Sequence, residues 1–285
     1  MLPRPPMRRR TWLRVLLAIL LVFVAIASYR VLGVYRFQAG ECTALPARAF
    51  NPTYPPRLTV MTFNIEGHAS LLKGTHIEEI AAVIRKYAPD VVAINEAHRN
   101  TWQARFEDHV EQLRLLTGMN IVFGRSYTFA GGDFGNAVLT RGDIVSSEVR
   151  DLPGTGEPRT LLESVIRIHG GTIEMYVTHT TAWVSVNRET RRDQLRCILA
   201  HVRSSRHPFI LAGDLNAPPD APEMAEFLAQ DGMRIVGDPK TPTHRVLEQR
   251  LDYILADPGW IVRSARVLED GPSDHRPVLA ELIHR

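Results

Sequence analysis

The sequence predicts an α/β fold in which two mixed sheets form the core and helices cover their outer faces. From residue 58 onward, short apolar runs typical of strands alternate with segments of helical periodicity. In the middle of the chain several strand-like runs follow one another without a helix between them, which indicates antiparallel pairing. Many of these runs end on an acid, an amide or a histidine, so we expect a polar rim at one edge of the sheets.

The expected elements follow in order along the chain. One helix is predicted from Thr75, where Glu78 three residues later completes a capping box. Further helices are predicted from about Thr101, from Asn187 to near Ser204, and over APEMAEFLAQ. The strand-like runs are LTVMTFN, DVVAIN, NIVFG, NAVLT, LLESVIRI, TIEMYVTH, PFILAG, LDYILA, WIVRSARVL and PVLAELI.

Charge is distributed unevenly along the 285 residues. The formal net charge is +3, yet residues 1–36 contain seven arginines and no acid. Residues 37–285 therefore carry 27 basic against 31 acidic residues. A domain that holds DNA mainly through phosphate contacts is usually basic, so nucleic acid is not the favoured partner of this acidic domain.

An uncharged apolar run covers residues 15–29 and follows a cluster of arginines between residues 8 and 14. This pattern predicts a membrane anchor or an export signal. We expect a single uncleaved N-terminal hydrophobic helix in the membrane, with the arginine-rich end in the cytoplasm and the main domain outside. Secretion after cleavage near Ala27 is the alternative.

The chain is expected to have three parts. These are a basic N-terminus with the apolar segment (1–36), a proline-containing linker (37–57) and one catalytic domain (58–285). The two cysteines are Cys42 in the linker and Cys197 in a predicted helix. We expect Cys197 to be a small buried apolar side chain and expect no disulfide between the two.

Five short polar segments stand at or near strand ends. Carboxylate and amide oxygens suit Mg2+ or Mn2+ and a phosphoester better than zinc or a nucleophilic serine. Asp214 and Asn216 alternate across Leu215, so an extended backbone would direct both polar side chains to the same face. The segments are Asn64-Ile65-Glu66, Asn95-Glu96, Thr178-His179, Gly213-Asp214-Leu215-Asn216 and Ser273-Asp274-His275.

Residues 58–285 resemble the endonuclease/exonuclease/phosphatase superfamily, which has the deoxyribonuclease-I-like fold. The resemblance implies a four-layer α/β/β/α sandwich with two mixed, mostly antiparallel sheets. It also implies a phosphoesterase that depends on a divalent metal, Mg2+ or Mn2+. The matching segments, in family order, are MTFNIEG, DVVAINEA, GNAVLTR, YVTHT, LAGDLNAPP, RLDYILA and GPSDHRPVL.

Metal and substrate ligands are implied by the same resemblance. Asn64, Glu96 and Asp274 match the residues that hold the metal. Asn136 matches a family segment and is a candidate substrate contact, or it orients its neighbours. Arg99 is a candidate phosphate contact because it stands just past Glu96; the alternative is a solvated charge at a helix entry. Glu66 falls outside the family pattern. Asn95 and Thr180 depart from it, at positions that flank the predicted chemistry.

Catalytic roles follow from the resemblance for five further residues. Asp214 would orient or deprotonate the attacking water, and Asn216 would donate a hydrogen bond in the transition state. His275 would contact the phosphate or act as acid or base, with Asp252 fixing its tautomer. His179 would protonate the leaving oxygen. Whether Asp214 or His275 is the general base stays open at this point.

The predicted function is a phosphodiesterase that acts outside the cytoplasm, near the membrane, on a lipid or a small phosphodiester. A membrane-associated or exported nuclease of the same fold is one alternative. A catalytically inactive binding module is another, although such a module would have little need of the complete polar set. The sequence predicts a phosphoester substrate and a membrane contact through the N-terminal segment, and it indicates no protein partner.

Overall fold

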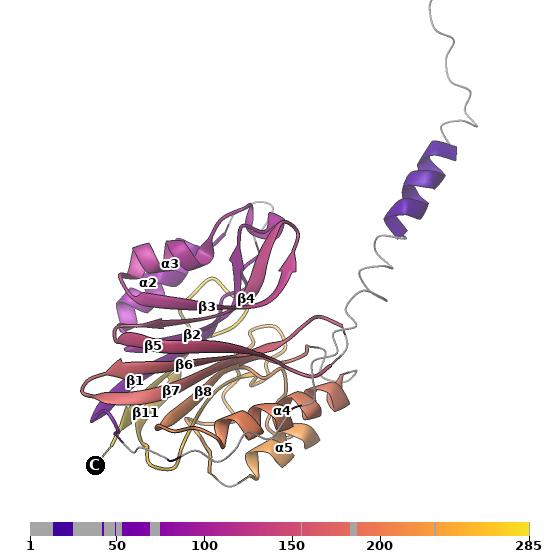
Figure 1. Ribbon diagram of the computed structural model, residues 1–285. Helices are drawn as coiled ribbons and strands as arrows, with labels where there is room; N and C mark the ends of the chain where they lie inside the picture. The colour runs from indigo at the N-terminus through magenta and orange to yellow at the C-terminus, as the bar shows by residue number, and fades with distance from the viewer. Residues whose placement is uncertain are drawn as a thin grey trace, which may run out of the picture.

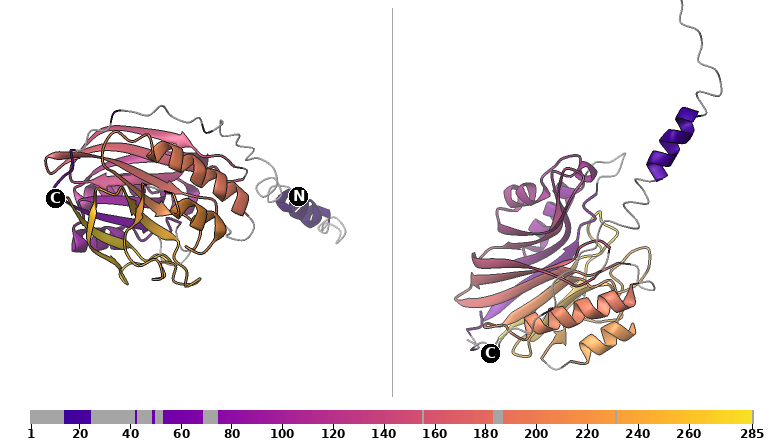
Figure 2. Two further views of the ribbon diagram at one scale, coloured as in Figure 1. Left: turned by 90° about the horizontal axis from the view of Figure 1, so that it is seen from below. Right: turned by 45° about the vertical axis from the view of Figure 1, so that its right-hand side comes forward.

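Two sheets lie face to face at the centre of the domain, and helices cover the outer face of each (Figure 1). The computed structural model describes residues 14–24, 42, 49, 53–68, 75–154, 156–182, 187–230 and 232–284. Figure 2 shows helices α2 and α3 on one side of the paired sheets and α4 and α5 on the other. These helices span Ile77–Tyr87, His109–Thr117, Arg188–Val202 and Pro222–Leu228.

The first sheet has six strands in the order β11-β12-β1-β2-β4-β3. Strands β1 and β2 run parallel, and the other neighbours in this sheet are antiparallel. The strands are β1 (Arg57–Asn64), β2 (Val91–Arg99), β3 (Asn120–Phe129), β4 (Gly132–Thr140), β11 (Ile261–Val267) and β12 (Val278–Ile283).

The second sheet also has six strands, in the order β5-β6-β7-β8-β10-β9. Here β7 and β8 form the parallel pair, and the other neighbours are antiparallel. The strands are β5 (Asp143–Asp151), β6 (Thr160–Ile168), β7 (Gly171–His179), β8 (Phe209–Asp214), β9 (Arg234–Ile235) and β10 (Asp252–Ala256).

Three apolar clusters separate the layers. One lies between the sheets and contains alternate residues of the central strands, such as Val60, Val177 and Ile254. A second packs α2 and α3 on the first sheet, and a third packs α4 and α5 on the second. The architecture is therefore an α/β/β/α sandwich with two mixed, mostly antiparallel sheets, as expected.

Two helix starts differ from the prediction. Helix α2 begins at Ile77, after His76, and its start has no side-chain capping bond. The hydroxyl of Thr75 donates instead to Glu107, so the predicted capping box is wrong. The helix expected from Thr101 is a short 3-10 turn, η1 (Trp102–Ala104), followed by a separate α3.

Strand β5 was not expected from the sequence. It is an edge strand, and most of its residues are exposed. Because both of its faces are largely solvated, it lacks the apolar run that marks a buried strand. Helix α4, in contrast, begins after Asn187 as expected.

A disulfide joins Cys42 to Cys197, which corrects the expectation that Cys197 is an unpaired apolar side chain. The two Cα atoms lie 5.4 Å apart, within the range of a normal disulfide, although the cysteines are separated by 155 residues. The number of residues between two cysteines does not indicate whether the linker folds back onto a helix so far along the chain, so this pairing could not be predicted. The bond attaches the segment before the domain to α4.

Residues 14–24 are helical and exposed. Within the described part of the chain, no helix combines the length and apolar character that crossing a membrane requires. The rest of the predicted anchor, the alternative cleavage position near Ala27 and most of the linker lie outside the described residues.

Candidate active site

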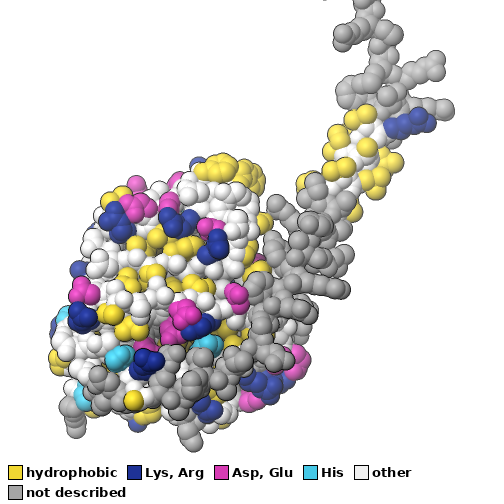
Figure 3. Space-filling model, viewed as in Figure 1, with side chains coloured by type: hydrophobic (Ala, Val, Ile, Leu, Met, Phe, Trp, Pro, Cys, Tyr) yellow, Lys and Arg dark blue, Asp and Glu magenta, His cyan; other side chains and the backbone are white. Residues whose placement is uncertain are grey.

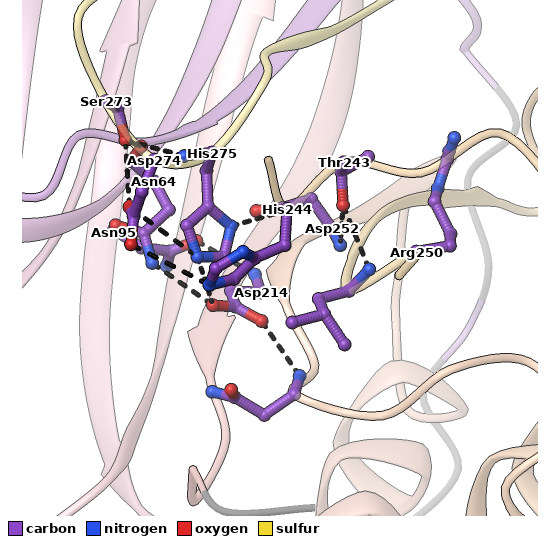
Figure 4. Close-up of polar contacts among 12 residues, drawn as sticks. Asn64, Asn95, Asp214, Thr243, His244, Arg250, Asp252, Ser273, Asp274 and His275 are labelled. Atoms are coloured by element: carbon purple, nitrogen blue, oxygen red, sulfur yellow. Dashed lines mark hydrogen bonds and ion pairs between the residues drawn. The ribbon is translucent and has the colours of Figure 1, made fainter. Parts of the chain in front are cut away.

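The polar strand ends meet at one edge of the two sheets (Figure 4). Asn64 ends β1, His179 ends β7 and Asp214 ends β8. Because β7 and β8 are parallel, His179 and Asp214 are register partners. Asp252 starts the antiparallel strand β10 and pairs with Asp214 from the other side. The topology alone therefore brings side chains from both sheets together.

Glu96 reaches the site through an irregularity in β2. The pairing of β2 with β4 shifts register between Ile94 and Ala97, and Glu96 has a backbone φ of 62°. A bulge of this kind redirects a side chain, and a positive φ in a residue other than glycine is strained. Asn216, just after β8, has a φ of 48°. Two predicted site residues thus occupy strained backbone at the sheet edge.

Asp214 lies at the centre of the hydrogen-bond network. Asn64 Nδ2 donates to Asp214 Oδ2 at 3.1 Å and to Glu96 Oε1 at 3.0 Å. The backbone N–H of Asn216 donates to Asp214 Oδ1 at 2.8 Å. One carboxylate is thus held by an amide side chain and a backbone N–H, and it is almost fully buried.

Two imidazoles flank the same carboxylate. His179 Nε2 lies 3.5 Å and His275 Nε2 lies 3.7 Å from Asp214 Oδ2. His275 Nδ1 donates to Asp252 Oδ2 at 2.8 Å, which fixes the orientation of that ring. The structure therefore brings together His179, Asp214, Asp252 and His275, four of the five residues with predicted catalytic roles. The fifth, Asn216, lies beside them, and its amide nitrogen donates to Thr180 O.

The two histidines have opposite shifts in pKa. Burial lowers the pKa of His275, but the carboxylates of Asp252 and Asp214 raise it to about 10. Burial, together with the charges of Arg159 and His275, lowers the pKa of His179 well below its usual range. At neutral pH His275 is therefore a cation and His179 is neutral. When the surroundings shift the pKa values of two histidines in opposite directions, the two can take different roles in acid–base chemistry.

The carboxylates are also unequal. Burial and the nearby Asp252 carboxylate raise the pKa of Asp214 to about 7, although the charge of His275 opposes the rise. Burial raises the pKa of Asp252 as well, but the charge of His275 and its hydrogen bond overcome this effect and lower it. Burial raises the pKa of Glu96, because the single amide of Asn64 compensates it only partly.

The donor set fits a divalent cation. Glu96, Asp214, Asp252 and Asp274 offer hard carboxylate oxygens, and His275 is a cation close to the last three of them. Glu96 has a raised pKa and accepts a hydrogen bond from a neutral amide, so a cation beside it would relieve its burial. Oxygen ligands of this kind suit Mg2+ or Mn2+.

The three predicted metal ligands do not all touch one another. Asn64 and Glu96 are in direct contact. Asp274 lies on the neighbouring side, where its Oδ1 is 4.0 Å from His275 Nε2, and its charge still acts on Glu96. The unassigned Glu66 belongs to this side too, since its Oε2 accepts from the backbone N–H of Asp274 at 3.1 Å.

The two predicted substrate contacts are not part of this cluster. Asn136 is buried, and its side chain bonds to Asn95 and to Thr160 O, which fits the alternative that it orients its neighbours. The guanidinium of Arg99 forms a two-pronged ion pair with Asp108, at the start of α3. With its side chain 42% exposed and paired at the start of α3, Arg99 fits the alternative of a solvated charge at a helix entry, and the phosphate contact stays a prediction.

Asn95 has a structural role that sequence analysis did not assign. Its amide nitrogen donates to Asn136 Oδ1 and to Thr178 O, and its Oδ1 accepts from the backbone N–H of Asp214 at 2.9 Å. One fully buried amide thus connects β2 of the first sheet to β7 and β8 of the second. The only sign of this role in the sequence is that Asn95 stands next to Glu96, in a polar segment at a strand end.

His244 is a third histidine of the site, and sequence analysis did not identify it. Its ring centroid lies 4.7 Å from that of His275, and its Nε2 lies 3.7 Å from Asp274 Oδ2. The backbone N–H groups of Val246 and Leu247 both donate to its Nδ1 at 3.2 Å. Nδ1 therefore carries no proton, and the ring hydrogen of the neutral form is on Nε2. In this tautomer His244 is a hydrogen-bond donor and not a metal ligand.

Comparisons with known proteins agree with this geometry. The model of the Endonuclease/Exonuclease/phosphatase family matches residues 61–275. An endonuclease/exonuclease/phosphatase from Beutenbergia cavernae is 28% identical with a TM-score of 0.71, over 80% of this chain and 72% of that one. The comparison with curated proteins gives no match.

Two further structures share the fold at lower identity. The human Nocturnin catalytic domain, with bound sulfate, is 21% identical with a TM-score of 0.67, over 81% of this chain and 94% of that one. A mannosyl-6-phosphatase from Bacteroides thetaiotaomicron is 18% identical with a TM-score of 0.65, over 79% and 99% respectively. With the family match covering most of the chain, these observations show that the protein belongs to the endonuclease/exonuclease/phosphatase family of hydrolases.

Proposed function

We propose that this protein is a divalent-metal-dependent phosphodiesterase that acts outside the cytoplasm, close to a membrane, on a lipid or a small phosphodiester. The observation that carries the proposal is the position of Asp214 between His179 and His275, with Asn64 joining it to Glu96. This places a buried carboxylate, a cationic imidazole and a hard-oxygen ligand set around one point. A binding module without activity would gain nothing from burying these charges.

Asp214 is the better candidate for the general base. Its pKa of about 7 allows it to accept a proton near neutral pH, whereas His275 with a pKa of about 10 is already protonated there. Asn64 and the Asn216 backbone fix the carboxylate for contact with the attacking water. The water would then attack phosphorus in line with the leaving oxygen.

The two histidines then have different tasks. His275, charged and oriented by Asp252, contacts a phosphoryl oxygen and stabilises the negative charge that develops there. His179 is neutral, so its proposed assistance to the leaving oxygen is that of a neutral hydrogen-bond donor. Mg2+ or Mn2+, held by Glu96, Asn64 and Asp274, would supply additional positive charge at the phosphate.

Two features support a location outside the cytoplasm. Disulfides persist mainly in oxidising compartments, and Cys42 is bonded to Cys197. The apolar run of residues 15–29 follows five arginines and precedes two, a bias that keeps the N-terminal end in the cytoplasm. Together they favour an anchored domain on the outer side, with secretion after cleavage as the alternative.

An exposed aromatic pair supports a lipid surface as the place of action. Trp102 and Phe106 are 67% and 61% exposed. The backbone N–H of Trp102 donates to the carbonyl of Ala130, at the tip of the β3–β4 hairpin. In Figure 3 hydrophobic side chains gather over the end of the domain that carries this hairpin in Figure 1. Exposed aromatic side chains are typical of membrane interfaces.

A substrate panel tests the proposal. The purified protein is assayed with Mg2+ and with Mn2+ on bis-p-nitrophenyl phosphate, p-nitrophenyl phosphate, sphingomyelin, glycerophosphodiesters and plasmid DNA. We expect hydrolysis of the diesters, with lipid or small substrates preferred. Cleavage of plasmid DNA in preference to all others would establish the nuclease alternative. No hydrolysis of any of them by a folded, metal-loaded protein would favour the binding module.

A further inference from the structure

Arg159 is a buried cation that the catalytic scheme does not use. It directly precedes β6, and its side chain is 6% exposed. Nη2 forms an ion pair with Glu157 Oε1 at 2.9 Å. Nε and Nη1 are buried and have no hydrogen-bond partner among the described residues. Two donor groups of one buried guanidinium are therefore unpaired.

Such an arrangement costs free energy unless a ligand compensates it. Buried N–H groups are almost always hydrogen-bonded, and the cost of leaving one unpaired is larger for a charged group. Arg191, which is also fully buried, shows how this protein satisfies a structural arginine. Its Nε donates to Glu223 Oε1 at 3.0 Å and its Nη1 to Thr181 O at 3.1 Å. Arg159 has no equivalent set of hydrogen-bond acceptors among the described residues.

The backbone places Arg159 at the edge of the active site. Strands β6 and β7 pair in register up to Leu161 opposite Thr178, one residue before His179. The carbonyl of Thr160, next to Arg159, accepts hydrogen bonds from the side chains of Thr178 and Asn136. Arg159 therefore lies just before the start of β6, beside the end of the antiparallel strand β7.

Electrostatics agrees with this placement. The positive charge of Arg159 contributes to the lowered pKa of His179. It also opposes the rise in the pKa of Glu96. The charges of Arg159 and His275 thus both act on His179 and Glu96, although the two cations come from different strand ends.

We propose that Arg159 binds a non-bridging phosphoryl oxygen of the substrate through one of its unpaired donors, Nε–H or an Nη1–H, on the His179 and Glu96 side of the site. The inference rests on the proposed phosphoesterase function, and it adds a second protein contact with the phosphate to the one proposed for His275. His275 and Arg159 would then approach one phosphate from two sides. Glu157 pairs with Nη2 alone and is itself 42% exposed, so it leaves Nε and Nη1 without an acceptor among the described residues.

The test is binding of inorganic phosphate to the full chain in the presence of Mg2+ at constant ionic strength. We expect Arg159→Gln to raise the Kd for phosphate by at least tenfold and Arg159→Lys to raise it less. Arg167→Gln is the matched control, because Arg167 is an exposed arginine at the other end of β6, and we expect no change. Equal Kd values for wild type and a folded Arg159→Gln would overturn the inference.

A second measurement covers the case in which Arg159→Gln does not fold. The Nε–H resonance of Arg159 in the wild type, assigned through its own side-chain carbons, should shift when phosphate is added. A resonance that does not move at saturating phosphate would reject the contact. Phosphate binding that depends on Arg159 in a protein that hydrolyses no phosphoester would refute the proposed function while supporting the anion site.

Discussion

His275 Nδ1 lies 2.8 Å from Asp252 Oδ2, and this pair joins the last polar segment of the chain to the start of β10. The hydroxyl of Thr243 accepts from the backbone N–H of Asp252, so the start of β10 is itself held in place. His275 therefore presents Nε2 to Asp214 in a fixed orientation. In the proposed function His275 contacts the substrate, and Asp252 acts only by orienting His275.

Replacing the two members of this pair should have unequal effects. His275→Ala removes the proposed phosphate contact and should reduce kcat by roughly a hundredfold or more. Asp252→Asn keeps a hydrogen-bond partner but removes the charge, so we expect a smaller loss and a lower pKa for His275. The pKa is measured by NMR titration of the ring and kcat by turnover on bis-p-nitrophenyl phosphate. A larger loss for Asp252→Asn than for His275→Ala would contradict this division of roles.

The disulfide should stabilise the domain without contributing to catalysis. Cys42→Ser or Cys197→Ser opens a bond between residues 155 positions apart, and we expect each to lower the free energy of unfolding by about 2–5 kcal/mol. Denaturant unfolding of each variant against the wild type measures this. The bond should also form in cells, and labelling of both thiols without prior reduction would argue against an oxidising compartment.

Stability should fall at acidic pH partly because of His109. Burial lowers the pKa of this fully buried histidine to about 4, below the value of about 6.5 expected in the unfolded chain. Its contribution is therefore present above pH 6.5 and is lost as the pH falls toward 4. At about 1.4 kcal/mol per pH unit, the loss is about 3 kcal/mol.

His109→Gln should flatten this pH dependence, because glutamine does not titrate. Unfolding free energies between pH 4 and pH 7 provide the measurement. His76→Gln is the control, since His76 is only partly buried at the start of α2 and should leave the slope unchanged. An unchanged slope in His109→Gln would show that other groups cause the acid sensitivity.

The aromatic pair near the β3–β4 hairpin should matter for lipid substrates alone. Replacing Trp102 and Phe106 together with serine removes exposed apolar area, so turnover of a phosphodiester lipid in vesicles should fall by roughly tenfold. Turnover of soluble bis-p-nitrophenyl phosphate should not change. Leu115→Ser is the control, since Leu115 is 65% exposed on α3. Equal losses on both substrates would contradict a role at a surface.

Much of this architecture could be predicted because its signals are local. Buried strands read as apolar runs, and residues that end parallel strands, such as Asn64 and Asp214, meet at one sheet edge. The parts that could not be predicted depend on the surroundings. Edge strand β5 has few buried residues, and Cys42 finds its partner only through the path of the linker.

The same limit applies within the site. Arg159 and His244 lie in segments without periodicity, so nothing in the sequence distinguishes them from loop residues. Their meaning depends on burial, unpaired nitrogens and a neighbouring imidazole, all of which are three-dimensional properties. Arg99 shows the reverse case, because its place after Glu96 indicated a phosphate contact, whereas the partner that the structure gives it is Asp108.

The most direct test of the account is turnover of bis-p-nitrophenyl phosphate by the wild type and by Asp214→Asn, each with EDTA and after Mg2+ or Mn2+ is restored. Thermal melting of both proteins verifies that they are folded. We predict that EDTA abolishes wild-type turnover, that the metal restores it, and that Asp214→Asn stays at least about a hundredfold lower while folded. Full turnover in chelated wild type, or near-wild-type turnover in Asp214→Asn, would contradict the assignment of this site.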